Sequence, residues 1–369
     1  MPPTATKPIA DPIRMEPQAI AEMAHLRYYT DDKPGFTRKK AAVKGGFHFF
    51  DLQGKRITDT DEIQRIHSLA VPPAYTDVWI CPNPRGHLQA TGRDARGRKQ
   101  YRYHLRWRET ADANKYSRVM AFAAALPGIR KRVDADLAKP ALPREKVIAA
   151  IVKLLEKTLI RVGNEEYART NKHYGLTTMR DRHVRIKGGT VEFHFKGKSG
   201  VDHEIDLEDA RLAKVVKACQ DVPGQELFQY YDAEGQRHGV DSSDVNSYLQ
   251  EISGEPFTAK DFRTWAGTVL ASIALKEFET FDSEAAAKKN ILAAIESVAQ
   301  RLGNTPSVCR KCYIHPAILD SYVDGSMLKS LQQRAEEELK SDHLGSLKPE
   351  EAAVVALLRE RLALEVKDK

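Results

Sequence analysis

The sequence predicts an α+β protein with a small β-rich N-terminal domain and a larger, mainly α-helical domain that contains a small antiparallel sheet. Three observations support this division. Alternation of polar and apolar residues dominates up to Trp107, a helical period replaces it after about residue 114, and alternation returns only within 183–207. The 369 residues are enough for two or three domains.

The N-terminal part divides into an arm and a β-rich domain. Residues 1–25 contain five prolines and no hydrophobic periodicity, so we expect a flexible arm. The domain that follows covers residues 26–114. Its expected strands are FHFFD (47–51), joined to RIT as a hairpin through a turn containing GK, then VWICP (78–82), HLQATG (87–92) and QYRYHLRW (100–107).

The last of these segments belongs to a strongly basic stretch. Residues 85–108 contain eight Lys or Arg and one acid, Asp94, so this stretch alone carries a charge of +7. A strand at 100–107 places its aromatic residues on one face and Arg102 and Arg106 on the other. Like charges crowded on one face repel one another unless an anion lies against them, which favours a phosphate-facing surface over an ordinary solvated face.

Residues 115–330 have the pattern of the larger, catalytic domain. A helix is expected at 143–160, and two or three antiparallel strands with Gly-containing turns are expected at 183–207. Further helices are expected near 208–220, 242–252, 258–275 and 284–302. Residues 331–369 are expected to form a helical extension, because 334–369 carry seven basic and nine acidic side chains around a heptad-like apolar stripe. Surface helices are the first interpretation, and an element that packs against the domain or a partner is the alternative.

The composition excludes several classes of protein. The chain is 41% hydrophobic and 30% charged, which is ordinary for a folded soluble protein. It has no run of about 18 apolar residues that could span a membrane, and its start, MPPTATKPIADPIRMEP, lacks the apolar core of a secretory signal. Four cysteines do not make a disulfide framework and fit a reducing cytoplasm. The net charge of +7 permits a nucleic-acid partner without requiring one.

Two motifs resemble cofactor or metal sites but lack essential parts. GKS at 197–199 resembles the end of a phosphate-binding loop, but position 192 is Glu where that loop needs glycine, so no nucleotide is expected. CRKC at 309–312, with His315, would make half a zinc site, and no second ligand pair lies at a usable spacing. No acidic cluster is expected to hold Mg²⁺ for two-metal phosphodiester chemistry. We therefore expect no metal and no other cofactor.

Five polar residues of the larger domain together suit one reaction, the attack of a tyrosine hydroxyl on a DNA phosphodiester. Tyr313 is the candidate nucleophile, and because free tyrosine has a pKa of about 10, nearby cations must favour its ionised form. Arg161 and Arg263 would grip the non-bridging oxygens of the transition state. Asn304 would add a neutral donor, and Lys198, in a turn between strands, would protonate the departing 5′ oxygen.

The surroundings of these residues resemble the type IB DNA topoisomerases, in the compact poxvirus-like form found in bacteria. The resemblance covers roughly residues 26–325. The segments that carry it are, in order, GRDARGRKQYRY (92–103), IRVGNEEYARTNKHYGLTTM (160–179), FHFKGKSGVDHE (193–204), KDFRTW (260–265) and LGNTPSVCRKCYIHP (302–316). Any one segment would be a weak signal, but five in the same order make a strong one.

The resemblance implies roles for individual residues. The implied catalytic residues are Arg161, Lys198, Arg263, Asn304 and Tyr313. The implied DNA contacts are Gln100, Tyr101, Arg102, Tyr103, Arg106, Tyr167 and Lys260. One position departs from the family, because the poxvirus and nuclear enzymes carry His where this chain has Asn304. Asn donates a hydrogen bond without a charge, so we expect retained activity with a slower chemical step or an altered pH dependence.

The resemblance also implies a course of reaction. The two domains form a C-shaped clamp around duplex DNA, Tyr313 cuts one strand and keeps its 3′ phosphate, and the free 5′ end swivels before resealing. Supercoils are relaxed without ATP or metal, since the covalent ester conserves the bond free energy. The expected partner is double-stranded DNA, with no membrane and no nucleotide. We expect a bacterial, cytoplasmic, nucleoid-associated monomer.

Three other functions stay open at this point. A tyrosine recombinase or integrase would share the phosphotyrosine chemistry, but it would usually show H-x-x-R where this chain has KDFR (260–263), and a helical N-terminal arm. A non-catalytic DNA-binding protein could keep the same fold. A metal-dependent nuclease would need the acidic cluster that the sequence lacks.

Overall fold

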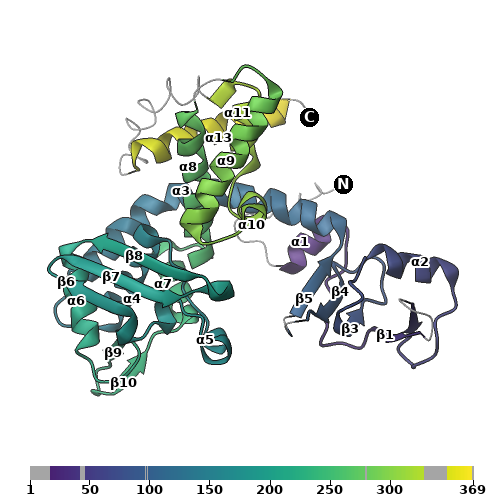
Figure 1. The fold of residues 1–369 in the computed structure, drawn as a ribbon, viewed down its shortest axis with the longest axis horizontal. Coiled ribbons are helices and arrows are strands. Elements are labelled where there is room, and N and C mark those ends of the chain that lie inside the picture. The colour runs from purple at the N-terminus through teal and green to yellow at the C-terminus, as the bar shows by residue number, and fades with distance from the viewer. Residues whose placement is uncertain are drawn as a thin grey trace, which may run out of the picture. The chain divides into compact units, whose positions relative to one another are not determined.

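The protein is described by a computed structural model. The structure describes residues 17–41, 46–95, 97, 99–278, 281–327 and 347–367, with side chains there except those of 109, 111–117 and 362–367. The chain divides into two compact units, Met1–Arg118 and Val119–Lys369 (Figure 1). The division falls within one helix, α3 (Leu105–Leu137), which also contains the domain boundary that we placed at 114/115.

The first unit is built on a five-stranded antiparallel sheet in the order β2-β1-β3-β4-β5. Its elements before α3 are α1 (Pro17–Met23), β1 (Phe36–Lys40), β2 (Phe47–Phe50), α2 (Thr60–Ser68), β3 (Thr76–Ile80), β4 (Leu88–Arg93) and β5 (Lys99–Tyr103). The predicted hairpin between 47–51 and RIT is present but short: the N–H of Asp51 donates to the carbonyl of Lys55, and the N–H of Ile57 donates to that of Phe49. Along its length β2 pairs with β1, which the sequence analysis did not predict. RIT contributes one bridge, from Arg56 to Phe50, before Asp59 caps the start of α2.

An apolar core lies between this sheet and α2. Val78, Ile80 and Ala90 of the central strands form a buried cluster with Phe49 of β2 and Ile66 of α2. β5 closes the sheet as an edge strand, and its side chains alternate between exposed and half-buried. The sheet thus presents one row of β5 residues to solvent.

The strand predicted over 100–107 ends early. β5 stops at Tyr103, and the N–H of Arg108 then donates to the carbonyl of His104, which forms the first turn of α3. The rings of Tyr103 and Trp107 nevertheless stack, with centroids 6.2 Å apart. Residues four apart share a side in a strand and also in a helix, so the pattern alone did not locate the change.

The arm predicted over residues 1–25 contains a helix in the part that the structure describes. α1 lies within it, and Ala21 and Ala24 form a small buried cluster with Leu26 against Trp107. Seven residues are too few for a clear helical period, which is why the sequence pattern missed α1. Residues 1–16 lie outside the described residues.

The second unit is mostly helical and contains a three-stranded antiparallel sheet in the order β6-β7-β8 (Figure 1). Its elements after α3 are α4 (Arg144–Thr158), α5 (Glu165–Asn171), η1 (Leu176–Thr178), η2 (Asp181–His183), β6 (Val184–Lys187), β7 (Thr190–Lys196), η3 (Lys198–Gly200), β8 (Asp202–Glu208), α6 (Ala210–Gln220), β9 (Gln229–Tyr231), β10 (Arg237–Gly239), α7 (Ser242–Ser253), α8 (Ala259–Glu277), α9 (Glu284–Leu302), α10 (Pro306–Cys312), α11 (Pro316–Val323) and α13 (Pro349–Lys367). The strands predicted within 183–207 and the helices predicted around them are present. The α+β fold class is therefore confirmed.

Helix α4 forms the centre of this unit. It packs against α6, α7, α8 and β8, and nine of its fifteen residues are buried. Val191, Phe193 and Phe195 of β7 alternate into the same interior. The central helix and the sheet therefore form one rigid base, from which the chain leads on to Arg161 and to Lys198.

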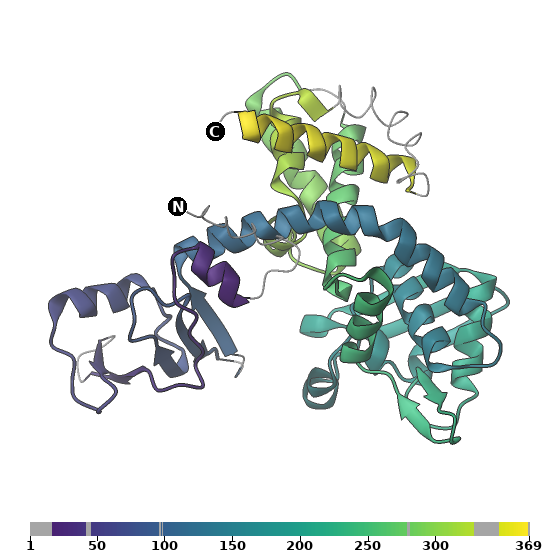
Figure 2. The same ribbon diagram turned by 180° about the vertical axis from the view of Figure 1, so that it is seen from behind.

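The C-terminal extension is not a surface element where the structure describes it. α13 packs against α8 and α11 (Figure 2), and residues 351–358 are all buried. The carboxylate of Glu351 accepts two hydrogen bonds from Arg130, at 2.7 and 2.8 Å, and one from the indole of Trp265. The charges counted over 334–369 suggested a surface segment, although the helix also contains the apolar run AAVVALL. The remainder of the extension, 331–346 and 368–369, lies outside the described residues.

Candidate active site

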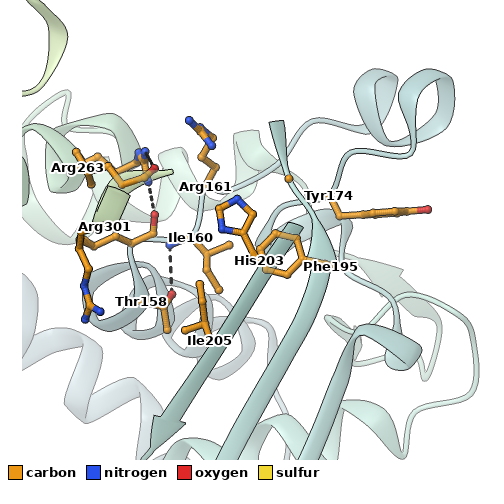
Figure 3. Close-up of a pocket in the computed structure, with 12 residues that line it drawn as sticks. Thr158, Ile160, Arg161, Tyr174, Phe195, His203, Ile205, Arg263 and Arg301 are labelled. Atoms are coloured by element: carbon orange, nitrogen blue, oxygen red, sulfur yellow. Dashed lines mark hydrogen bonds between the residues drawn. The ribbon is translucent and has the colours of Figure 1, made fainter. Parts of the chain in front are cut away.

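Four of the five predicted catalytic residues lie at helix ends or near a helix start in the second unit. Arg161 follows the end of α4, and Arg263 lies in the first turns of α8. Asn304 follows the end of α9, and Tyr313 caps the end of α10. Residues far apart in the sequence therefore meet where these helices converge, and Figure 3 shows the pocket that contains the two arginines.

The end of α4 directs Arg161 toward the end of α9. Leu159 caps α4 in the left-handed conformation, with φ 58°, so the helix stops just before Arg161. The guanidinium donates to the carbonyl of Gly303 at 2.9 Å and to Oδ1 of Asn304 at 2.5 Å. The second bond fixes the amide, whose nitrogen makes a long 3.4 Å hydrogen bond to the carbonyl of Leu302. Asn304 is thus held with its NH₂ group available as a donor.

Arg263 is deeply enclosed, with 4% of its surface exposed. It donates to the carbonyls of Leu159 and Leu302, the second at 2.8 Å. Both carbonyls belong to helix C-terminal ends, where the helix dipole concentrates negative charge and stabilises a cation. The Nε of Arg263 is buried and has no hydrogen-bond partner within the described part of the chain. It therefore keeps a donor for an anion.

The two guanidiniums are close enough to influence one another. Burial and the charge of Arg263 lower the pKa of Arg161 to about 10. Arg161 nevertheless stays charged at neutral pH, because that pKa is still well above 7. A phosphate bound between the two groups would offset the desolvation and the repulsion that lower the pKa of Arg161.

Tyr313 is positioned by α8. Its half-buried ring packs against Arg263, with 5.2 Å between Cζ and the ring centroid, a cation–π arrangement. Its carbonyl accepts a hydrogen bond from the hydroxyl of Thr268 at 3.3 Å. Gly267 permits this approach, because a Cβ there would lie 2.6 Å from the carbonyl oxygen of Tyr313. One helix therefore holds both Arg263 and the candidate nucleophile.

Lys198 lies at the edge of the site. It begins η3, between β7 and β8, and its side chain is exposed. Gly197, the residue before it, lines the pocket that contains Arg161 and Arg263. Within the described residues no hydrogen bond or ion pair joins the Lys198 ammonium to the other four candidates. The structure therefore brings the turn to the site and leaves the lysine side chain in solvent.

His203 is a residue of this pocket that the sequence analysis missed. Its ring stacks on Phe195 with centroids 5.0 Å apart and lies beside Arg161 (Figure 3). Burial and the charges of Arg161 and Arg263 lower its pKa, so the imidazole is neutral at pH 7. Alternation along β8 was the available signal, because His203 and Ile205 share the inward face of that strand.

Two family models match the chain. One, described as eukaryotic DNA topoisomerase I, catalytic core, covers residues 104–343. The other, described as bacterial DNA topoisomerase IB, N-terminal domain, covers residues 46–94. The chain belongs to the type IB DNA topoisomerase family. The family predicted from the five segments is therefore confirmed.

Individual relatives agree with the family models. The DNA topoisomerase 1B of Acanthamoeba polyphaga mimivirus is 34% identical over 295 residues, which span 78% of this chain and 87% of the viral protein. The DNA topoisomerase 1B of vaccinia virus, strain Copenhagen, is 22% identical over 298 residues, spanning 78% of this chain and 91% of that protein. Family membership places the chain among isomerases that act on DNA and decides against the recombinase alternative.

The predicted DNA contacts on β5 lie on two faces. Tyr101 and Tyr103 are 45% and 36% exposed, and their rings stack with centroids 6.0 Å apart. Arg102 points to the opposite face, is half-buried, and donates to the carbonyl of Ala70 at 3.3 Å. The structure thus separates the aromatic and the basic side chains of this strand, as their alternation predicts.

The remaining predicted contacts are distributed over both units of this topoisomerase. Gln100 donates to the carboxylate of Asp94 at 3.0 Å, and Arg106 is exposed at the start of α3. In the second unit, Tyr167 is 49% exposed on α5, and Lys260 is exposed at the start of α8. The side chains of Arg106, Tyr167 and Lys260 are therefore accessible to a large ligand, whereas Gln100 is half-buried.

Neither of the misleading motifs forms a site in the described part of the chain. Among those residues no group of three or more His, Cys, Asp or Glu could hold a metal ion. Cys309 is buried in α10, and His315 caps α11 by accepting the N–H of Ala317 at 3.1 Å. The GKS turn at 197–199 leads into a strand. Over the same described residues, no helix is long and apolar enough to cross a membrane.

Proposed function

We propose that this topoisomerase relaxes supercoiled duplex DNA by cutting one strand through Tyr313 and resealing it. The observation that carries the proposal is the packing of the Tyr313 ring against the enclosed guanidinium of Arg263, with Arg161 and Asn304 in the same site. Cations beside the reacting groups stabilise the negative charge that develops when a tyrosine oxygen attacks a phosphate. The names of the relatives, which are DNA topoisomerases, support the same substrate.

In the proposed step, the phenolate oxygen of Tyr313 attacks the phosphorus of one DNA strand. A bond forms between that oxygen and phosphorus, and the bond from phosphorus to the 5′ oxygen breaks, so the 3′ phosphate stays on the enzyme. The phenol proton leaves to solvent, and Lys198 gives a proton to the departing 5′ oxygen. The free end rotates, and the reversed steps reseal the strand.

Two arginines and an amide are the proposed ligands of the reacting phosphate. A guanidinium carries five N–H donors, and the main-chain carbonyls occupy only some of those on Arg263. Its buried Nε can donate to a non-bridging oxygen, and Arg161 can grip the other oxygen. Asn304, oriented by Arg161, offers its NH₂ group. These donors stabilise the charge that grows in the transition state.

The proposed reaction needs no cofactor. Each step exchanges one phosphate ester for another, so the rotation is driven by the torsional free energy of the supercoil and not by ATP. In other phosphodiester chemistry a metal ion supplies the positive charge and its bound water supplies the proton. Here the guanidiniums supply the charge and a lysine supplies the proton.

We also propose where and in what form the enzyme works. The match of residues 46–94 to a bacterial N-terminal domain supports a bacterial enzyme, whose substrate would be nucleoid DNA in the cytoplasm. All five proposed catalytic residues come from one chain, which supports a monomer.

A plasmid assay tests the proposal. The protein is incubated with negatively and with positively supercoiled plasmid, in EDTA and without ATP. We expect a ladder of closed, relaxed circles from both substrates. Plasmid that stays supercoiled would contradict the proposed function. Nicked or linear products that accumulate, and that require Mg²⁺, would instead indicate a nuclease.

The β5 surface gives a second prediction. Arg102→Ala combined with Arg106→Ala should weaken DNA binding and reduce the slope of log Kd against log salt by about 1 to 2, because each lost phosphate contact releases fewer counterions. Tyr101→Ala combined with Tyr103→Ala should weaken binding with an unchanged slope, since tyrosine carries no charge. Lys55→Ala, exposed after β2 at the opposite edge of the sheet, is the matched control. An unchanged slope in the arginine variant would show that Arg102 on β5 and Arg106 on α3 do not contact phosphates.

Asn304 gives a third prediction. Asn304→Ala should slow single-turnover cleavage of a duplex oligonucleotide by about 10²-fold, because a donor to the phosphate and a partner of Arg161 are lost together. Asn304→His should retain activity, and its cleavage rate should acquire a dependence on pH between about 5 and 8 that the wild type lacks. An inactive His variant would show that the residue does not contact the phosphate as proposed.

A further inference from the structure

We propose that His203 is a positioning residue of the cleavage site. Its ring is a spacer between two turns, one that precedes Lys198 and one that precedes Asn304. The inference rests on the proposed function of the site. In that reaction His203 neither forms a bond to the phosphate nor transfers a proton.

Two glycines enclose the ring from opposite sides. A Cβ on Gly197 would lie 2.6 Å from both Cδ2 and Nε2 of His203. A Cβ on Gly303 would lie 2.6 Å from Cε1 of the same ring. Real Cβ atoms do not approach other heavy atoms so closely, so the ring fits between these two backbones only because both residues lack side chains. The ring itself therefore sets the separation of the two turns.

Each of these glycines is next to a proposed catalytic residue. The N–H of Gly197 donates to the carbonyl of Val201 at 2.8 Å and closes the turn that carries Lys198. The carbonyl of Gly303 accepts a hydrogen bond from Arg161 at 2.9 Å, directly before Asn304. A shift of the His203 ring would thus move the proposed general acid relative to the proposed phosphate ligands.

The ring is itself anchored from behind. It stacks on Phe195, which is 7% exposed and packs into the interior of the sheet. The charges of Arg161 and Arg263 disfavour a third positive charge beside them, so a neutral ring suits this position. Shape and rigidity, rather than proton transfer, are therefore what His203 contributes.

His203→Ala tests the role directly. We expect the single-turnover cleavage rate at saturating enzyme to fall by about 10- to 10²-fold, because small misplacements of catalytic groups are costly. The Kd for duplex DNA should stay within about twofold of the wild-type value, since no contact between His203 and DNA is proposed. His194→Ala is the matched control, because His194 is exposed on the neighbouring strand and should leave the rate unchanged. An unchanged rate in His203→Ala, or an equal loss of rate and of affinity, would overturn the proposal.

A double-mutant cycle with Gly197→Ala tests the mechanism. Gly197 has φ −89° and ψ −166°, which alanine adopts without strain, so the substitution acts through the added Cβ alone. In the wild-type background it should slow cleavage, because the Cβ collides with the His203 ring. In the His203→Ala background the collision is gone, and the same substitution should cost at most about twofold. Additive losses would show that His203 does not act through the Lys198 turn.

The denaturant midpoints of unfolding, measured for the four proteins of the same cycle, test this proposal separately from the proposed function. Gly197→Ala should lower the midpoint of the wild type and leave that of His203→Ala nearly unchanged. A wild-type protein that fails to relax plasmid would contradict the proposed function, whereas additive shifts of the midpoint would contradict the packing of the ring against Gly197. The two failures are therefore distinguishable.

Discussion

Tyr313→Phe is expected to abolish plasmid relaxation, lowering it by at least about 10⁴-fold. The substitution removes only the phenolic oxygen, so the ring keeps its packing against Arg263, and the backbone keeps its hydrogen bond from Thr268. The fold and the affinity for duplex DNA should therefore be retained. Without the oxygen no ester between Tyr313 and the 3′ phosphate can form.

The measurement combines relaxation with trapping of the intermediate. Denaturation of wild-type reactions with detergent should leave the protein covalently attached to the 3′ phosphate of the cut strand, and the Phe variant should give no such adduct. Tyr231→Phe is the control, because that tyrosine is 46% exposed on β9 and outside the site. Relaxation by the purified Phe variant at the wild-type rate would assign the chemistry to another residue.

The sequence predicts the local elements of this protein better than the contacts between them. Many residues contribute to the helical periods of α8 and α9 and to the alternation of β7 and β8. A few residues that depart from these patterns therefore do not obscure them. The start of α3 is different, because Tyr103 and Trp107 fit a strand and a helix equally well. Helix α13 was placed first at the surface because charged residues flank its apolar run AAVVALL, which is buried in the structure.

The candidate site shows the same limit. Arg161, Arg263, Asn304 and Tyr313 could be named because each lies in a short segment that resembles the family. Their partners could not, because the hydrogen bond from Arg161 to Gly303 joins residues 142 positions apart. His203 lies in one of the quoted segments and was still missed, since its role depends on two glycines that come close only in the fold.

Arg263→Ala is the second large effect that we expect, and it should act on both chemistry and stability. The single-turnover cleavage rate should fall by about 10²- to 10³-fold, because a buried donor to the phosphate and the cation beside Tyr313 are lost together. The carbonyls of Leu159 and Leu302 would also lose their donor in the interior, which should cost about 1–3 kcal/mol of unfolding free energy. Denaturant unfolding and quenched cleavage reactions measure the two effects separately.

Arg263→Lys separates the charge from the geometry of the guanidinium. Lysine keeps the positive charge, but its ammonium concentrates three donors at one point and cannot span the two helix-end carbonyls while it also reaches a phosphate oxygen. We therefore expect the rate to stay about 10²-fold low even if stability recovers. Arg301→Ala is the control, because Arg301 lines the same pocket but is exposed, and its rate should stay within a few-fold of the wild type. A fully active Lys variant would mean that charge alone is needed at this position. The convergence of α4 and α9 on Arg263 would then serve the fold and not the reaction.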